Sequence, residues 1–262
     1  MGRRGLLQLA TCACCTRLLP ASAAEWSYGA AVPSGVGGWP AVSKTCAAGS
    51  AQSPVDLRVG DVAAQETRAL TFAYAPRAVT VSNPHGGAQV NFAPAQAPTV
   101  LLGERKLELV QFHFHTPSEH ALDGNRLAME AHLVHRDAET GKLAVLGVLM
   151  RADAGALPNT ALAAALRYGP RGDTVVDAPV QVNPAALLPA ARTFLEYRGS
   201  LTTPPCSEEV RALLVLLPSW AMALSSCASP HRSPGLCSRL PFLCRQARWW
   251  RTKPSSGSKS TR

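Results

Sequence analysis

The chain has 262 residues, of which 47% are hydrophobic, and its mean hydropathy is close to zero. This composition excludes a chain that is disordered throughout, because it supplies enough apolar side chains for a large core. All-β architectures often exceed about 200 residues as one unit, so a single domain is the simplest interpretation.

The net charge of +9 comes from the two ends of the chain. Residues 1–24 carry three arginines and residues 218–262 carry eight lysines or arginines, with no acidic residue in either segment. Residues 25–217 therefore hold fifteen basic and seventeen acidic side chains. This slightly acidic central region argues against a surface that binds nucleic acid.

The N-terminus has the pattern of an export signal. Two arginines precede a mostly apolar run at residues 5–19, and small residues at 21–24 offer a cleavage site. We therefore predict a periplasmic or secreted protein whose mature chain begins near Glu25. Arg17 inside the apolar run leaves a cytoplasmic amphipathic start as the alternative, and lipid attachment at Cys12 is less favoured. No other stretch is apolar for long enough to span a bilayer.

From residue 69 to residue 148, short β-branched or aromatic runs are separated by Pro, Gly and Asn. Strands at this spacing predict a large sheet. The expected strands are Thr71–Tyr74, Ala78–Ser82, Ala88–Phe92, Leu107–His115, Ala128–His135 and Leu143–Met150. Further along, Asn159 to Leu166 is the clearest helical stretch, and Leu213 to Leu217 is expected to be a buried strand.

Residues 218–262 differ from the rest of the chain, because they are rich in Ser, Pro, Arg, Cys and Trp and have no period of two or 3.6. We interpret them as a disordered or aberrant tail, and a basic arm for membranes or nucleic acid is the alternative. The expected division is thus a signal peptide at 1–24, one domain at 25–217 and this tail.

Of the eight cysteines, only Cys46 and Cys206 lie in the central region. Two cysteines in an exported domain indicate one disulfide. Two buried free thiols are the alternative.

The segment from Gln111 to His120, QFHFHTPSEH, carries the clearest chemical signal. If it begins as a strand, alternation sends Gln111, His113 and His115 to one face. The phenylalanines between them then point to the other face, into apolar packing. An isolated His-X-His pair is more often a core or surface feature, so the surrounding residues decide its meaning.

A third imidazole comes from the next expected strand, where Glu130, His132 and Val134 share one face. Three neutral imidazoles that meet at one point are the ligand set of a catalytic zinc with an open fourth position. Gln111 and Glu130 are residue types that could accept the second N–H of a metal-bound imidazole. A structural zinc site is less favoured, since such sites usually have four protein ligands.

Hydroxide on such a zinc would need a hydroxyl that accepts its hydrogen bond and donates to a fixed carboxylate. Thr202 and Thr203, held by two following prolines, offer such a hydroxyl, and Glu119 is the obvious carboxylate. By itself the Thr-Thr-Pro-Pro run is merely a stiff loop.

Three segments, in this order and spacing, resemble the signature of the α-carbonic anhydrases, closest to the bacterial exported type: Gln111–His120, Glu130–His135 and Gly199–Glu208. The resemblance extends from about Trp26 to about Leu217. It implies a mainly β protein with minor α content, a single domain with a central twisted, mostly antiparallel sheet of about ten strands, and an active site in a conical cleft. The implied reaction is reversible hydration of carbon dioxide to bicarbonate and a proton on zinc-bound hydroxide.

The resemblance also implies roles for individual residues. The implied Zn²⁺ ligands are His113, His115 and His132, with Gln111 and Glu130 hydrogen-bonded behind them. Thr202 would orient the hydroxide, oriented in turn by Glu119, and Thr203 would contact bicarbonate. The implied apolar wall for carbon dioxide is Val134, Val145 and Leu201, and the implied disulfide joins Cys46 and Cys206.

Asn83-Pro84-His85 resembles the segment that carries the proton-shuttle histidine of the family, so His85 is expected to move protons between the site and buffer. Its unperturbed pKa of roughly 6.5 suits this exchange. An ordinary exposed loop histidine is the alternative. His120 and His135 match positions that do not bind zinc, and we expect His120 to form structural hydrogen bonds.

Two departures from the family pattern concern activity. The family has a tryptophan at the position of Ala212, so a methyl group there should widen the pocket and loosen carbon dioxide binding. Beyond Leu217 the family normally continues with a helix and strands that finish the sheet. We therefore expect the C-terminal part of the sheet to be incomplete, while a domain's net stability is only about 5–15 kcal/mol.

Two alternatives to an active enzyme stay open. One is a catalytically impaired or non-folding truncated homologue, and the other is a zinc-containing binding module of the same fold. The expected partners are small molecules, namely carbon dioxide, bicarbonate and water, and hydrolysis of activated esters would be a side reaction. The sequence does not determine the oligomeric state.

Overall fold

The computed structural model describes residues 26, 28, 36–63, 69–84, 87–152, 157–172, 174–190, 193–215 and 221–222. The expected signal peptide, the expected proton shuttle His85 and almost all of the expected tail lie outside the described residues. Within these ranges, none of the helices has the length and apolar character needed to cross a bilayer.

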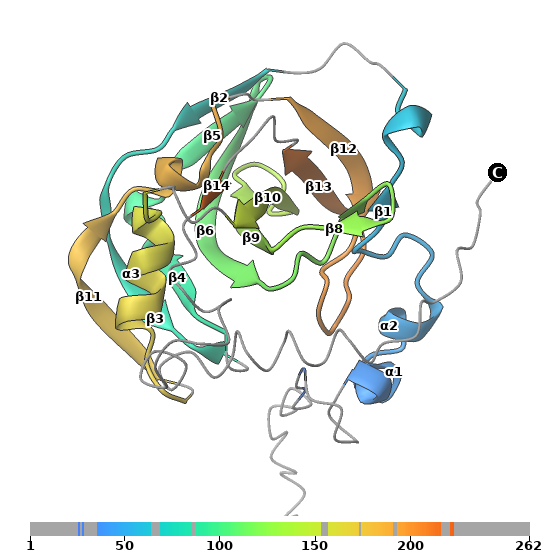
Figure 1. Cartoon of the computed structure of the whole chain (residues 1–262), viewed down its shortest axis with the longest axis horizontal. Helices are drawn as coiled ribbons and strands as arrows, with labels where there is room; N and C mark the ends of the chain where they lie inside the picture. Colours follow the sequence, from blue (N-terminus) through green and yellow to red (C-terminus); the bar gives the residue numbers. More distant parts are fainter. Residues whose placement is uncertain are drawn as a thin grey trace, which may run out of the picture.

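One large sheet of eleven strands dominates the described part of the chain (Figure 1). Its main path, from edge to edge, is β11 (Val175–Val182), β3 (Arg77–Ser82), β4 (Gln89–Phe92), β6 (Arg105–His115), β9 (Met129–Asp137), β10 (Leu143–Ala152), β13 (Val210–Val215) and β12 (Phe194–Gly199). Beside this path, β2 (Leu70–Ala73) pairs with β5 (Thr99–Leu102), β5 pairs with β6, and β14 (Ala221–Met222) pairs with β10. Within the described part of this sheet, only β10–β13 and β10–β14 are parallel pairs. The expected mainly β fold with a mostly antiparallel sheet of about ten strands is confirmed.

A small second sheet consists of β1 (Asp56–Leu57), β7 (Ala121–Leu122) and β8 (Asn125–Arg126). It pairs the N-terminal part of the chain with the residues directly after Glu119 and His120. Glu119 and His120 therefore lie on the short segment between β6 and β7, and a sheet holds this segment at each end.

Helices lie at the edges of the sheet (Figure 1). The longest, α3 (Thr160–Tyr168), begins where the Asn159 side chain accepts hydrogen bonds from the backbone N–H groups of Ala161 and Leu162. It packs against β11, and the helix expected at Asn159–Leu166 is confirmed. The remaining helices are short: η1 (Val36–Gly38), α1 (Trp39–Val42), α2 (Thr45–Ala48), η2 (Val59–Asp61), η4 (Pro94–Gln96) and η5 (Pro184–Leu187).

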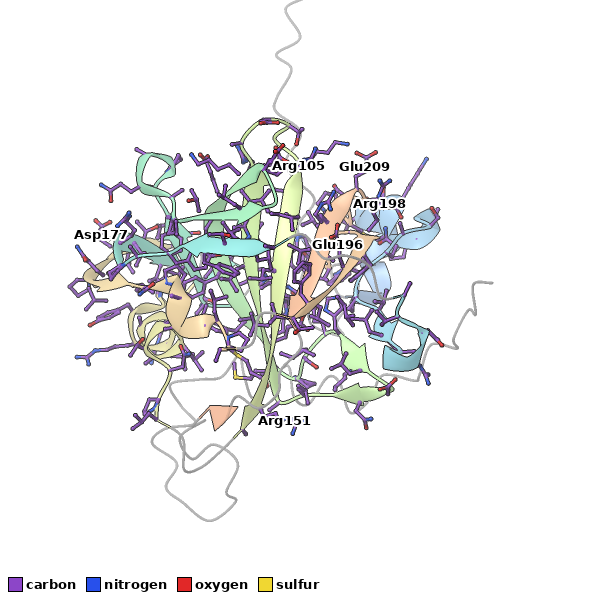
Figure 2. All side chains as sticks on the ribbon, turned by 90° about the horizontal axis from the view of Figure 1, so that it is seen from above. Arg105, Arg151, Asp177, Glu196, Arg198 and Glu209 are labelled. Atoms are coloured by element: carbon purple, nitrogen blue, oxygen red, sulfur yellow. A yellow bond between two sulfur atoms is a disulfide. The ribbon has the colours of Figure 1, made fainter. Side chains whose placement is uncertain are left out.

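The hydrophobic core lies on one face of the central strands. Phe112 and Phe114 in β6 are 0% and 6% exposed and contact each other edge to face, as the alternation predicts. They pack in one cluster with Leu133 of β9 and Leu146 of β10. Figure 2 shows charged side chains at the periphery of the molecule, among them Arg105, Arg151, Asp177, Glu196, Arg198 and Glu209. The core covers one face of β6 and β9, and the three histidines expected to bind zinc lie on the opposite face.

A disulfide joins Cys46 in α2 to Cys206 in the loop between β12 and β13. The disulfide expected from the sequence is confirmed, and two free thiols are excluded. Around it, Oγ of Ser43 donates to the carbonyl of Pro205, and Nε2 of Gln52 donates to the carbonyl of Cys206. The N-terminal segment is thus fastened to the loop that carries Thr202.

Candidate metal centre

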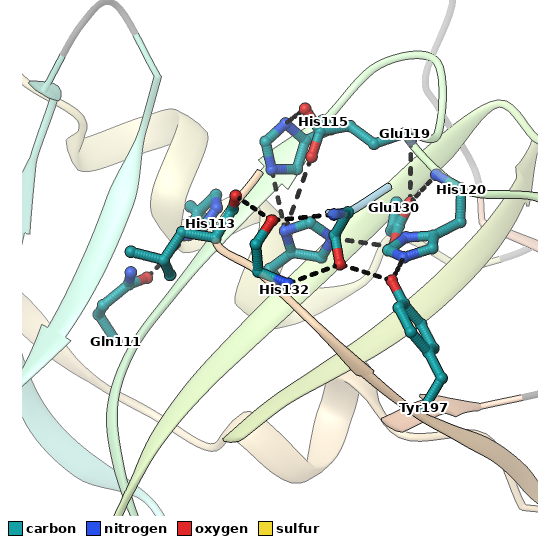
Figure 3. Close-up of polar contacts among 11 residues, drawn as sticks. Gln111, His113, His115, Glu119, His120, Glu130, His132 and Tyr197 are labelled. Atoms are coloured by element: carbon teal, nitrogen blue, oxygen red, sulfur yellow. Dashed lines mark hydrogen bonds and ion pairs between the residues drawn. The ribbon is translucent and has the colours of Figure 1, made fainter. Parts of the chain in front are cut away.

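Three histidines meet on the face of β6 and β9 that points away from the phenylalanine core (Figure 3). His113 and His132 are directly opposite each other in the antiparallel pair, and His115 lies one pleat further along β6. One nitrogen from each ring lies within 4.8 Å of those of the other two. The convergence expected from the two strand patterns is present.

The outward-facing nitrogens of two of these rings are held by neighbouring side chains. Nδ1 of His113 donates to Oε1 of Gln111 at 2.9 Å, and Nε2 of His132 donates to Oε1 of Glu130 at 2.8 Å. Because an ionised carboxylate only accepts hydrogen bonds, His132 carries a proton on Nε2, and Nδ1 is its nitrogen on the side of the other two rings. That Nδ1 lies 3.1 Å from Nε2 of His115, so these two nitrogens point at a common place.

Burial keeps two of the imidazoles uncharged. It lowers the pKa of His113 to about 3 and that of His115 well below its usual value, and the nearby His132 lowers both further. For His132, burial also acts to lower the pKa, but the charge and hydrogen bond of Glu130 raise it overall. Glu130 itself is fully buried, yet its pKa lies well below the usual value because of His132 and His120. Two uncharged imidazoles, and a third held by a buried carboxylate, suit a divalent cation.

Glu119 is the second buried carboxylate of the site and is 5% exposed. Its Oε1 lies 3.4 Å from Nδ1 of His115. Burial raises the pKa of Glu119, whereas the charge of His132 and a hydrogen bond from Thr202 act in the opposite direction. Its other oxygen, Oε2, has no hydrogen-bond partner among the described residues and lies 4.0 Å from Nδ1 of His132. The three imidazoles therefore fit a zinc ion with an open position, and Glu119 lies beside them as an additional carboxylate.

A cavity of about 450 Å³ opens beside the three histidines. Strand register places Gln111, Val134, Val145 and Ala212 side by side across β6, β9, β10 and β13, on the face that carries His132. The cavity is therefore polar towards β4 and β6 and apolar towards β10 and β13. The lining includes nine of the expected site residues: Gln111, His113, His115, His132, Val134, Val145, Leu201, Thr202 and Thr203.

Close packing behind His132 depends on Gly147, which lies opposite it in β10. A Cβ atom at position 147 would lie 2.7 Å from Leu214 and 3.0 Å from Oε1 of Glu130. Glycine therefore makes room for the carboxylate that holds His132.

Sequence reasoning missed Tyr197, Ser53 and Ser200, which connect to the site through His120. Tyr197 and Ser53 are 144 residues apart but hydrogen-bonded at 2.8 Å. No local pattern marks these residues, although His120 was expected to form structural hydrogen bonds and does so with Glu130 and Tyr197.

Comparison with known proteins identifies the family. The family model described as eukaryotic-type carbonic anhydrase matches residues 34–216. The chain belongs to the α-carbonic anhydrases. Enzymes of this family use three histidines as zinc ligands, and the corresponding triad is present here.

Several carbonic anhydrases illustrate the relationship. That of Nostoc sp. is 35% identical over 201 residues, which cover 75% of this chain and 75% of the relative. That of Pectobacterium carotovorum is 36% identical over 179 residues, covering 68% of this chain and 70% of the relative. The structure of Photobacterium profundum α-carbonic anhydrase superposes with a TM-score of 0.67 at 35% identity, covering 76% of this chain and 87% of that one.

Proposed function

We propose that this chain catalyses the reversible reaction of carbon dioxide with water to give bicarbonate and a proton, on a zinc ion held by His113, His115 and His132. The observation that carries the proposal is the convergence of three imidazole nitrogens within 4.8 Å, next to a cavity with an apolar wall. When bound, zinc lowers the pKa of a water ligand to about 7, a value known from carbonic anhydrases themselves and not obtained from this structure.

The neighbours of the histidines would hold them in the form that binds a metal. Gln111 and Glu130 accept the outer protons of His113 and His132, which fixes the tautomer and orientation of both rings. Loss of either acceptor would leave a buried ring free to turn. These two residues therefore act on the metal through the ligands.

Thr202 and Glu119 would orient the attacking oxygen. Glu119 accepts a hydrogen bond from Thr202, so the Thr202 oxygen keeps its lone pairs for a donor in the cavity. A water or hydroxide that donates to Thr202 would be held with a lone pair directed towards the carbon of the substrate. Thr203, which also lines the cavity, would contact the bicarbonate product.

The apolar wall would receive carbon dioxide. Val134, Val145 and Leu201 line the cavity on the side towards β10 and β13, where an uncharged substrate without hydrogen-bond donors binds best. Bicarbonate is charged and would be less favoured against this wall. The wall therefore places the substrate carbon near the oriented oxygen and favours release of the product.

We further propose that His85 transfers the released proton to buffer. Pro84, directly before it, and Gly87, two residues after it, line the cavity, which supports this role. We also propose export of the protein, which the disulfide between Cys46 and Cys206 supports, since disulfides persist in oxidising compartments.

A stopped-flow assay of carbon dioxide hydration on the purified protein, with bound zinc counted in the same sample, tests the proposal. We expect about one zinc per chain and catalysis above the buffer rate. Zinc without catalysis would favour a binding module of the same fold. Absence of both would favour an impaired homologue.

A further inference from the structure

Hydrogen bonds form a continuous row from His132 to Tyr197 in β12 (Figure 3). Nε2 of His132 and Nδ1 of His120 lie 2.8 Å and 2.7 Å from the same carboxylate oxygen, Oε1 of Glu130. On its other side, Nε2 of His120 lies 2.5 Å from the hydroxyl of Tyr197. The row thus crosses from β9, through the segment after β6, to β12.

From Tyr197 the row continues to the loop that carries Thr202. The Tyr197 hydroxyl lies 2.8 Å from Oγ of Ser53. Ser53 and Ser200 bind each other twice: the N–H of Ser53 donates to Oγ of Ser200 at 2.9 Å, and the N–H of Ser200 donates to Oγ of Ser53 at 3.1 Å. Tyr197 therefore lies between a metal ligand and the loop expected to orient the reacting oxygen.

The chemistry of the groups assigns a donor and an acceptor to every bond of the row. Glu130 can only accept, so His132 and His120 both donate to it. The Tyr197 hydroxyl has a single proton, which it donates to Nε2 of His120. Ser53 in turn donates to the oxygen of Tyr197, because the one proton of that hydroxyl is already directed at His120. The hydroxyl of Ser53 therefore donates to Tyr197, and the hydroxyl of Tyr197 donates to His120.

Gly199 leaves room for the Ser53 side chain to reach Tyr197. A Cβ atom at position 199 would lie 2.2 Å from Oγ of Ser53 and 2.7 Å from Cε2 of Tyr197. Any side chain there would push Ser53 away from Tyr197.

We propose that Tyr197 is a positioning residue: its hydroxyl holds His120 against Glu130, fixes the imidazole of His132 for the metal, and ties this row to the Thr202 loop. The inference rests on the proposed function, since it concerns the same metal site. Without the hydroxyl, Nε2 of His120 would be left without its partner in a mostly buried place, and the ring could turn away from Glu130.

The protein contains a matched control on the other face of β9. The hydroxyl of Tyr74 lies 2.6 Å from Nε2 of the buried His135, so this pair has the same chemistry as Tyr197 and His120. No hydrogen bond among those found for His135 leads to a residue of the metal centre. Removing each hydroxyl in turn therefore separates loss of a buried Tyr–His bond from loss of the link to the metal.

The experiment compares Tyr197→Phe and Tyr74→Phe in the full chain loaded with zinc. Both variants are first shown to be folded by circular dichroism, and release of zinc to an excess of chelator is then timed. We expect release about tenfold faster in Tyr197→Phe and unchanged in Tyr74→Phe, because outer partners of metal ligands typically change metal affinity about 10–100-fold. With zinc in excess, kcat/KM for carbon dioxide should fall only in Tyr197→Phe.

A double variant tests the route of the effect. If Tyr197 acts through Glu130, Tyr197→Phe should not accelerate zinc release further in a Glu130→Gln background. Equal zinc release by the two single Phe variants, in a protein that binds zinc and hydrates carbon dioxide, would overturn this inference alone. An unaltered protein that binds no zinc would overturn the proposed function and this inference together.

Discussion

The two faces of the β6–β9 pair contain the same residue type in different roles. On one face, His113, His115 and His132 converge, and on the other His135 stacks on Tyr74 within the core. Burial alone does not distinguish them, because it lowers the pKa of His135 to about 4 just as it lowers that of His113 to about 3. The difference lies in geometry: on the first face one nitrogen from each of three rings lies within 4.8 Å of the others, whereas His135 is a single ring hydrogen-bonded to a hydroxyl.

The largest effect is expected from removing a converging imidazole. In His113→Ala we expect loss of bound zinc and a fall of carbon dioxide hydration to the buffer rate, since the two remaining ligands cannot hold the metal in an open tetrahedral site. His135→Gln is the matched control and should keep its zinc. Retained catalysis in His113→Ala, measured by stopped flow, would show that the converging histidines are not needed for the reaction and that the two faces do not differ in this respect.

The core face should respond in stability instead. Phe112 is fully buried, and Phe112→Ala is expected to lower the free energy of unfolding by about 3–5 kcal/mol, measured by chemical denaturation. The folded fraction should still bind one zinc per chain. A Phe112→Ala variant that folds normally but loses its zinc would show that the core face also determines zinc binding.

Glu130→Gln should have an intermediate effect. The carboxylate accepts from the backbone N–H groups of Glu119 and His120 and from the rings of His120 and His132. An amide offers one acceptor oxygen and places N–H donors against other donors, so we expect zinc affinity to fall about 10–100-fold, measured by competition with a chelator. Unchanged affinity would mean that Glu130 serves the fold alone.

The lowered pKa of His135 predicts a pH dependence of stability. Its pKa is about 4 in the folded state and about 6.5 when unfolded, so as the pH falls below 6.5 the unfolded chain binds a proton first. Stability should therefore fall between pH 6.5 and 4, by at most about 1.4 kcal/mol per pH unit from this group. The His135→Gln variant should show a smaller slope in denaturation at several pH values, and an equal slope would contradict the buried, uncharged state.

The smallest effect is expected at the apolar wall. Ala212 lies beside Val145 in the lining of the cavity, and we expect Ala212→Trp to lower KM for carbon dioxide by roughly tenfold or less, with zinc content unchanged. A raised KM in the stopped-flow assay would show that the wall already fits the substrate.

The metal ligands were predictable because their signal is local. Alternation over Gln111 to His115 has a period of two, and any strand converts it into one histidine face and one phenylalanine face. The pattern does not extend through all of β6: a register shift between Leu109 and Gln111 turns Leu107 and Leu109 to the core side that Phe112 occupies. Such a bulge leaves no mark in the sequence of a single chain.

Among the described strands longer than two residues, three were not predicted, for different reasons. In β11 (Val175–Val182) almost every side chain is exposed and Pro179 interrupts the run, so an edge strand shows no alternation. In β12 (Phe194–Gly199) the alternation is clear, but it is short and isolated from other strand signals. The four-residue β5 (Thr99–Leu102) is equally short. The row through Tyr197 and Ser53 depends on which strands become neighbours, which periodicity does not encode.

We propose that the histidine face of β6 and β9 holds a catalytic zinc. The most direct test is to remove zinc from the purified protein with a chelator, add it back in measured amounts, and follow carbon dioxide hydration by stopped flow at each step. The account predicts activity that disappears with the metal and returns in proportion to bound zinc, up to one ion per chain. Activity that persists without zinc, or a chain that binds one zinc and remains at the buffer rate, would contradict it.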